Sequence, residues 1–389
     1  MRPVAYAESG AGGRGGTSEP RIAIVCSWLN QYGGAERVLE TLHEMYPRAP
    51  IYTSMYSPKA MPRQFATWDI RTTFLQQVPF SRSHHQLFLP LYPIAFEQLD
   101  LAGYDLVVDV SSAFSYGVLT RPETPHVSYC LTPARFLWNY HEYARRESLG
   151  PLARVALAPL LTWLRSWDVE AARRVDHFVA ISRLVERRIR KYYGRESSII
   201  YPAIDVHRFE PAPPREVEDY YLVVSRLIPY KRIDLAVEAF NRLRLPLKIV
   251  GSGRDRTALQ KMASPNVQFL GRVPDTDLKR LYARCRAFIF PGEEDFGLTP
   301  LEAQAAGRPV IAYGAGGALE TVKEGVTGEF FTAASAESLA QAVVDFRAER
   351  YDPVEIRSQA ERFDVEVFKR QFGAFVARLL ERREGAIGA

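Results

Sequence analysis

The sequence predicts an α/β protein built from two Rossmann-like, doubly wound domains that face each other across a cleft. Short apolar segments alternate with helical stretches along most of its 389 residues, which is the pattern of a mainly parallel sheet covered on both faces. The alternation stops at residues 203–219, where three prolines and several charges are typical of a linker, and then restarts. A chain of this length has room for about two domains.

The first domain is expected at residues 21–202. Residues 1–20 precede it; they are rich in glycine and small polar residues and lack the apolar core of a signal peptide, so we expect a flexible tail there. The strands of this domain are predicted at 21–27, 51–56, 104–112, 126–130, 177–182 and 197–202. Helical patterns lie between most of them, including 151–174 and 183–193.

The second domain is expected at residues 220–363 and repeats the alternation. Its strands are predicted at 220–225, 247–251, 267–271, 287–291, 308–313 and 328–331. Its helices are predicted at 232–243, 255–263, 275–284, 335–348 and 353–361, with one more from about Thr299. We expect the last helix, about 364–389, to pack back on the first domain.

Composition excludes several classes of protein. Hydrophobic residues make up 47% and charged residues 24%, as in ordinary globular proteins, so a mainly disordered chain is excluded. No window approaches 18 uninterrupted apolar residues, which argues against a membrane-spanning helix. Cys26, Cys130 and Cys285 are far apart and form neither a metal-binding pair nor a disulfide framework, so we expect a reduced, cytoplasmic setting.

The net charge of +5 lies entirely within residues 1–204. It is too small for the basic stripe of a nucleic-acid-binding domain, so no nucleic-acid partner is expected. An anionic membrane surface at the inner face of the membrane and a phosphate-bearing substrate both stay open as partners.

Three segments that follow predicted strands carry candidate site residues, because ligands of open α/β sheets bind at the carboxyl ends of the strands. Gly33 and Gly34 stand directly before a helix, where backbone N–H groups can approach an anion. Arg226 and Lys231 flank a proline-containing loop and could hold a diphosphate from two directions. A tight turn in the first segment and a solvated loop in the second are the alternatives.

The third segment, residues 291–312, is the most informative. Glu294 lies in a loop and Glu302 in the opening turns of the helix that follows, so both carboxylates could accept hydrogen bonds from sugar or ribose hydroxyls. Phe296, Gly297 and Leu298 lie between them at the helix start and offer backbone N–H groups to a phosphate. Dipole pairing for Glu302 and a solvated loop carboxylate for Glu294 are the alternatives.

Four motifs together carry a family resemblance. They are G-G-A-E at 33–36, S-R-L-x-P-x-K at 225–231, E-D-F-G-L-T-P-L-E at 294–302 and A-x-G-R-P-V-I-A at 305–312. In this order they resemble retaining glycosyltransferase family 4, which has the two-domain GT-B fold, over about residues 21–380. Segments of the first half, such as WLNQYGGAERVLETL and SYCLTPARFLW, resemble bacterial O-antigen and surface-polysaccharide mannosyltransferases.

The resemblance implies a nucleotide-sugar donor bound mainly by the second domain. Arg226 and Lys231 would hold the donor diphosphate and, with Glu294 at the sugar, form the catalytic set. Glu302 would bind the ribose. The other implied donor contacts are Gly33, Gly34, Gly251, Arg272, Phe296, Gly297 and Leu298. The implied reaction moves a hexose, mannose from GDP-mannose, to a polysaccharide or lipid-linked oligosaccharide, without cofactor or metal, because the two cations can stabilise the leaving diphosphate.

The sequence departs from the family in the first domain. Leu131 occupies the place of a histidine that many relatives carry in a Y-C-H-T-P-like segment, and leucine can neither donate a hydrogen bond nor move a proton. His126 lies five residues earlier, which places it on the opposite face of the same predicted strand. A structural role is therefore expected for His126, and the positioning of the sugar is put in doubt.

The acceptor side is expected near the segment that follows this strand. Arg135, Trp138 and Tyr140 would face the cleft and could stack sugar rings, although an aromatic helix of this kind also suits core packing. Residues 149–167 are apolar over much of their length and fit either a helix at a membrane surface or a buried helix between domains.

Several other functions stay open. A UDP-sugar-dependent glucosyltransferase and a sugar-nucleotide epimerase share the expected fold, and the substitution at Leu131 keeps a catalytically decayed, nucleotide-binding scaffold open. A nicotinamide dehydrogenase is disfavoured because the G-S-G that begins at Gly251 lacks the third glycine of a dinucleotide fingerprint.

Overall fold

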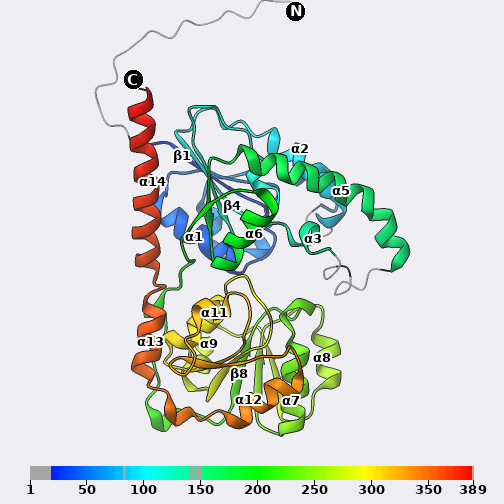
Figure 1. Ribbon diagram of the computed structural model, residues 1–389, viewed down its shortest axis with the longest axis vertical. Helices are drawn as coiled ribbons and strands as arrows, with labels where there is room; N and C mark the ends of the chain where they lie inside the picture. Colours follow the sequence, from blue (N-terminus) through cyan, green and yellow to red (C-terminus); the bar gives the residue numbers. More distant parts are fainter. Residues whose placement is uncertain (1–18, 82–84, 141–143, 145–149, 388–389) are drawn as a thin grey trace, which may run out of the picture.

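The computed structural model describes residues 19–81, 85–140, 144 and 150–387 (Figure 1). The tail expected at 1–20 therefore lies almost wholly outside the described residues. Two separate parallel sheets form two lobes, the arrangement that the alternating pattern predicts.

The sheet of the first lobe has seven strands in the order β3-β2-β1-β4-β5-β6-β7, and every neighbouring pair is parallel. The strands are β1 (Ile22–Cys26), β2 (Ile51–Thr53), β3 (Ile70–Thr72), β4 (Leu106–Ser111), β5 (His126–Cys130), β6 (His177–Ala180) and β7 (Ser197–Ile199). β1, β4 and β5 are buried throughout, as expected of strands covered on both faces. The sequence pattern misses β3, a half-exposed edge strand of three residues.

The sheet of the second lobe has six parallel strands in the order β10-β9-β8-β11-β12-β13. The strands are β8 (Tyr221–Val224), β9 (Leu247–Val250), β10 (Val267–Gly271), β11 (Ala287–Phe290), β12 (Val310–Tyr313) and β13 (Gly328–Phe331). All six lie within the predicted segments. In both lobes the first strand along the chain pairs with two others, so the strand order reverses there, and the loops after such strands are where ligands bind.

Helices cover both sheets. In the first lobe they are α1 (Gly34–Met45), α2 (Tyr92–Glu97), α3 (Arg135–Trp138), α5 (Pro151–Arg174) and α6 (Arg183–Tyr193). In the second lobe they are α7 (Ile233–Leu243), α8 (Arg256–Met262), α9 (Asp275–Arg284), α10 (Leu298–Ala305), α11 (Ala318–Thr321), α12 (Ala336–Asp345) and α13 (Pro353–Glu361). α2, α3 and α11 are short and have no periodic pattern long enough to predict them.

The chain crosses between the lobes twice, and the two crossings lie side by side. Residues 203–219 carry two short 3-10 helices, at Val206–Arg208 and Pro214–Glu216. The Ile204 N–H donates to the Phe363 carbonyl (3.0 Å), and the Val365 N–H donates to the Ile204 carbonyl (3.0 Å). After the second crossing, α14 (Val365–Ile387) runs along the first lobe (Figure 1).

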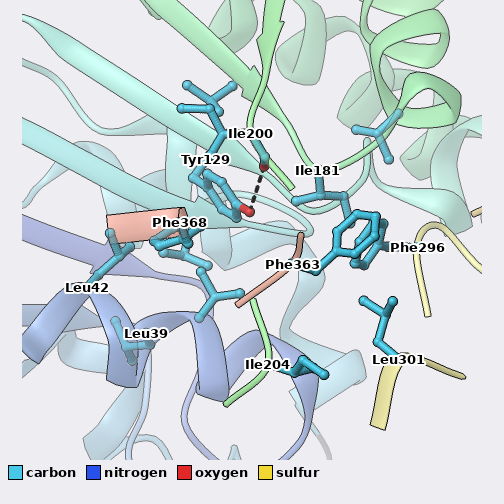
Figure 2. Close-up of a cluster of buried hydrophobic side chains, with 14 of the residues drawn as sticks. Leu39, Leu42, Tyr129, Ile181, Ile200, Ile204, Phe296, Leu301, Phe363 and Phe368 are labelled. Carbon is cyan, nitrogen blue, oxygen red and sulfur yellow. Dashed lines mark hydrogen bonds between the residues drawn. The ribbon is translucent and has the colours of Figure 1, made fainter. Parts of the chain in front are cut away.

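Apolar packing continues from one lobe into the other through these crossings. Phe368 and Phe372 of α14 meet the Tyr129 ring of β5 edge-on, with ring centroids 5.7 and 6.0 Å apart. Phe363 at the crossing packs against Phe296 of the second lobe at 5.7 Å. Figure 2 shows Tyr129, Phe296, Phe363 and Phe368 in one buried cluster, in which the Tyr129 hydroxyl donates to the Ile200 carbonyl at 3.0 Å. The cluster includes Phe296 and Leu301, which lie within the predicted acidic motif at 294–302.

Candidate functional site

Loops that follow β1, β8 and β11 meet at the boundary between the lobes. A Cβ atom on Gly34 would lie 3.4 Å from the Leu298 side chain, so the first turn of α1 touches the start of α10. We call residues 26–39 the first-domain wall, and residues 226–231 together with 291–302 the second-domain wall. The predicted residues Gly33, Gly34, Arg226, Lys231, Glu294, Phe296, Gly297, Leu298 and Glu302 all lie on these two walls.

Two glycines on the second lobe are required by the backbone. Gly297 precedes α10 with a φ of 98°, and a Cβ atom there would lie 2.8 Å from the Phe290 ring. Gly251, with a φ of 131°, approaches the carbonyl oxygen of Ser225 so closely that a Cβ atom would lie 1.9 Å from it. Both predicted glycines therefore let the chain turn sharply beside the Arg226 loop and the acidic motif.

Glu302 is almost completely buried in α10 and is held by two partners. It forms an ion pair with Arg37 of α1, and it accepts a hydrogen bond from the Tyr282 hydroxyl at 2.7 Å. The Coulombic attraction of Glu302 raises the pKa of Arg37 above its ordinary value. Glu302 is thus fixed on the wall of the second lobe by a cation from the first lobe.

Glu294 lies in the loop before α10 and forms an ion pair with Lys231. The Lys231 ammonium group also lies 5.0 Å from the centre of the Tyr230 ring. The motifs at 225–231 and 294–302 are therefore in direct contact, through the Lys231 ammonium group and the Glu294 carboxylate.

Arg226 reaches from the second lobe to the first. Its guanidinium donates to the Gln31 side-chain oxygen at 3.0 Å and to the Tyr230 hydroxyl at 3.2 Å. The side chain is exposed, so it can exchange these neutral partners for an anion at little cost in desolvation. Arg226 and Lys231 thus place two positive charges in the loop after β8, on the second-domain wall.

Asp295 was not predicted as a site residue, yet it joins the lobes. It forms ion pairs with Arg135 of α3, at 2.5 Å, and with Arg188 of α6. The Arg135 guanidinium also lies 4.8 Å from the centre of the Tyr230 ring. Arg135 was expected to face an acceptor; in the structure it contacts the acidic motif of the second lobe.

The other two aromatic candidates on the acceptor side belong to packing contacts. Trp138 stacks on Tyr192 with ring centroids 4.7 Å apart, and its indole N–H donates to the buried Asp168 at 2.6 Å. The Tyr140 hydroxyl lies 3.5 Å from the Arg154 carbonyl. For these two residues the structure favours the core-packing alternative.

Arg272 and Gly251 lie next to each other at the ends of β10 and β9. The Gly251 N–H donates to the Gly271 carbonyl at 2.7 Å, and the Arg272 guanidinium donates to the Ser252 hydroxyl at 3.2 Å. They lie at the carboxyl ends of β9 and β10, which follow β8 toward the edge of the sheet, so they are further out than the loop that carries Arg226.

The structure also separates His126 from the walls. Its Nε2 lies 2.8 Å from an oxygen of Asp109, both side chains are fully buried within the sheet, and Ser128 donates to the same aspartate at 3.1 Å. Burial raises the pKa of Asp109. This is the structural placement that the strand periodicity predicts.

Residues of the first-domain wall line a small pocket together with Val110, Ser112 and Leu131. Glu36, in the first turn of α1, faces the same pocket and is only 5% exposed. Burial raises the pKa of Glu36 to about 7, and hydrogen bonds from the backbone N–H groups of Glu36 and Gly33 partly oppose this rise. Glu36 belongs to the G-G-A-E motif at 33–36 but was not predicted as a site residue. Its position two residues after the glycine pair could have indicated that it lies at the site.

Comparison with known proteins assigns each half of the chain to a family model. Residues 32–208 match the model of Glycosyltransferase Family 4, and residues 207–363 match that of Glycosyl transferases group 1. The chain is 31% identical over 245 residues to a GDP-mannose-dependent alpha-(1-6)-phosphatidylinositol monomannoside mannosyltransferase of Mycolicibacterium smegmatis. It is 26% identical over 279 residues to the human Alpha-1,3/1,6-mannosyltransferase ALG2.

These alignments cover 52% and 62% of this chain, and each covers 64% of the relative, which is less than two thirds of its length. Among solved structures, Anabaena HepE in complex with UDP and glucose has a TM-score of 0.68 and 20% identity, over 92% of this chain and 100% of that one. At this identity the likeness concerns the fold, and that fold is GT-B. Both halves of this chain therefore match glycosyltransferase family models, and the two lobes that they form have the GT-B fold.

Proposed function

We propose that the protein is a retaining hexosyltransferase that moves mannose from GDP-mannose to a polysaccharide or lipid-linked oligosaccharide. The observation that carries the proposal is the meeting of Arg226, Lys231, Glu294 and Glu302 on one wall, opposite Gly33 and Gly34. Two cations, two carboxylates and a glycine-lined helix start are the groups that a nucleoside diphosphate sugar needs: charge for the diphosphate and acceptors for its hydroxyls.

The proposed chemistry follows from the charge that develops. When the bond between the sugar and the diphosphate breaks, negative charge grows on the leaving oxygen, and preorganised cations that meet this charge lower the barrier. Arg226 and Lys231 take this role. Lys231 must then turn from Glu294 to the diphosphate, which leaves the Glu294 carboxylate available to the hydroxyls of the sugar.

Glu302 takes the ribose of the nucleotide in this proposal. Its carboxylate is oriented by Tyr282 and paired with Arg37, so a ribose hydroxyl would donate to an oxygen that is already fixed. Arg272 and Gly251 stand at the outer edge, where the base would lie.

The choice of mannose rests on both relatives, whose names give mannosyl transfer as their activity. The choice of GDP rests on the Mycolicibacterium smegmatis relative, whose name gives GDP-mannose as donor. A UDP-sugar donor is the rival, because the neighbour HepE was solved with UDP and glucose. Purified protein should be incubated with a panel of GDP- and UDP-sugars, and mass spectrometry should identify the donor consumed. Consumption of a UDP-sugar alone would reject GDP-mannose, and consumption of none would favour the nucleotide-binding scaffold.

We also propose that the reaction needs no metal, since Arg226 and Lys231 can neutralise the diphosphate themselves. Turnover should then survive EDTA. Its loss on chelation, with rescue by magnesium or manganese, would assign the neutralisation to a metal instead.

The remaining proposal concerns the place of action, the inner face of the cytoplasmic membrane. Among the described residues, no helix is both long and apolar enough to cross a membrane. The support is α5, which buries Leu161 and Leu164 but leaves Leu152 and Val155 87% and 74% exposed. Flotation with vesicles that contain anionic lipid should retain the protein, and Leu152→Asp should weaken this retention.

A further inference from the structure

The pocket that the first-domain wall lines has one charged side chain, and its other lining residues are neutral. Leu39, Val110 and Leu131 are apolar, Ser27 and Gln31 are polar, and Glu36 is the charged residue among the described side chains that line it. Its volume of about 50 Å³ admits one or two water-sized groups but no sugar ring. A pocket of this size fits the hydroxyl-bearing edge of a larger molecule.

The pocket adjoins the proposed leaving-group cation. Gln31 lines the pocket and also accepts the hydrogen bond from Arg226 at 3.0 Å. The positive charge of Arg226 also favours the ionised form of Glu36. A hydroxyl held by Glu36 would therefore lie on the first-domain side of the cation that meets the donor diphosphate.

Glu36 differs from the acids of the second lobe because it lacks a cationic partner among the described residues. Glu294, Asp295 and Glu302 each form an ion pair with a lysine or arginine. Glu36 forms no salt bridge with any residue that the structure describes, and its known donors are two backbone N–H groups. A carboxylate has about four acceptor positions, so at least one is left for a hydroxyl. Leu131, on another side of the pocket, can supply no hydrogen bond.

We infer that Glu36 is a substrate-binding residue that determines acceptor specificity: its carboxylate accepts a hydrogen bond from a hydroxyl of the acceptor sugar, and only the hydroxyl-bearing edge of that sugar enters the pocket beside Arg226. The inference rests on the proposed glycosyl transfer. The donor sugar is assigned to Glu294 on the opposite wall, which leaves the first-domain pocket to the acceptor. The hydrogen bond orients the acceptor; no proton leaves it for Glu36.

Charge on Glu36 then governs acceptor binding. Ionisation near pH 7 is set by burial and by the groups that face the carboxyl, which are Arg226 from the loop after β8, Glu40 one turn further along α1, and Cys26 of β1. A carboxylate accepts hydrogen bonds better than a protonated carboxyl group. Transfer to an acceptor at low concentration should therefore rise as the pH increases through about 7.

The test compares Glu36→Gln with Glu40→Gln in the full-length protein, because Glu40 lies on the same helix and is paired with Tyr32 and Gln64 instead. Two rates are measured: hydrolysis of the donor without acceptor, and transfer to the best of the methyl α-glycosides of mannose, glucose and galactose. We expect Glu36→Gln to raise the KM for the glycoside about tenfold or more. Donor hydrolysis should stay within about twofold, and the rise in transfer with pH should disappear. Glu40→Gln should match wild type in both.

The outcomes separate the two claims. If wild type consumes no nucleotide sugar, the proposed function fails. If wild type hydrolyses the donor but Glu36→Gln transfers as well as wild type, or if no glycoside is glycosylated, the inference about Glu36 is wrong while the function stands. Equal losses of hydrolysis and transfer would place Glu36 at the donor sugar and also overturn the inference. Glu36→Asp keeps a carboxylate and should retain part of the pH dependence that Glu36→Gln loses; if Glu36 were purely structural, the two variants would not differ in this way.

Discussion

The two walls of the site treat negative charge in opposite ways. On the second-domain wall, Glu294, Asp295 and Glu302 are each neutralised by a cation, and two of these three receive it from the first lobe. On the first-domain wall, Glu36 is buried with backbone donors alone, and its pKa rises to about 7. The difference corresponds to two kinds of ligand. The anionic nucleotide sugar must replace a partner in an existing ion pair, whereas a neutral hydroxyl of the acceptor sugar needs a carboxylate oxygen that is not paired with a cation.

The strongest test of the second-domain wall is removal of its cations. Lys231→Ala and Arg226→Ala should each lower turnover about a hundredfold or more, because each removes charge that meets the leaving diphosphate. Both residues lie in a loop, so the fold should persist, which circular dichroism can check. Arg242→Ala, on the exposed side of α7, is the control and should leave turnover unchanged. Wild-type rates in a folded Lys231 or Arg226 variant would reject the assignment.

The two glutamates of this wall should differ in what they bind. Glu302→Gln should weaken binding of free GDP roughly ten- to a hundredfold, because a charged hydrogen-bonding partner of the ribose is lost. Glu294→Gln should leave GDP affinity nearly intact and lower sugar transfer. Calorimetry with GDP and assays of donor turnover measure both effects. The reverse pattern would show that the two placements are inverted.

Asp295 tests whether closure of the lobes matters as much as the charges. Asp295→Asn removes the carboxylate shared by Arg135 and Arg188, so the acidic motif is held less firmly against the first lobe. We expect turnover to fall roughly tenfold through loss of positioning. Small-angle scattering should show a broader distribution of shapes. Asp275→Asn, which removes an exposed partner of Arg208, should change neither quantity.

Much of this site was predictable from sequence, and the reasons are local. The glycines, Arg226, Lys231 and the two glutamates each lie in the loop after a strand or in the helix that follows it, and parallel strands bring their carboxyl ends to one edge of a sheet. The buried strands were predicted because they are continuous apolar segments, whereas the edge strand β3 has only three residues, half exposed.

What could not be predicted depends on contacts between distant segments. Arg37, Arg188 and Asp295 acquire their partners when the lobes meet, over separations of 265 and 107 residues for the bonds from the two arginines. The contact of Arg135 with Asp295 of the second lobe was not predicted for the same reason. Trp138 was predicted to face the cleft because it belongs to an aromatic segment after a strand. Its contact with the buried Asp168, which sequence does not reveal, shows that it packs within the first lobe.

The smallest expected effect tests the first-domain wall through stability. Burial raises the pKa of Glu36 from its ordinary value of 4.5, which applies when the chain is unfolded, to about 7 in the folded protein. Because the folded state holds the proton more tightly, this group lowers stability as the pH rises from about 4.5 to 7, by up to about 3 kcal/mol at higher pH. Glu36→Gln removes the penalty, so its Tm should exceed that of wild type by a few degrees at pH 8 and match it near pH 4.5.

A glutamate kept only to cap α1 predicts the opposite sign, since its replacement would lower the Tm at pH 8. Thermal unfolding of wild type, Glu36→Gln and Glu40→Gln across this pH range therefore distinguishes the two roles without any substrate. A carboxyl that costs stability at the pH where the enzyme works, and whose removal costs acceptor affinity, is retained for binding. That combination would distinguish the unpaired acid of the first-domain wall from the ion-paired acids of the second-domain wall. Removing one of the paired acids should lower stability, because its cationic partner is left buried without a counter-charge.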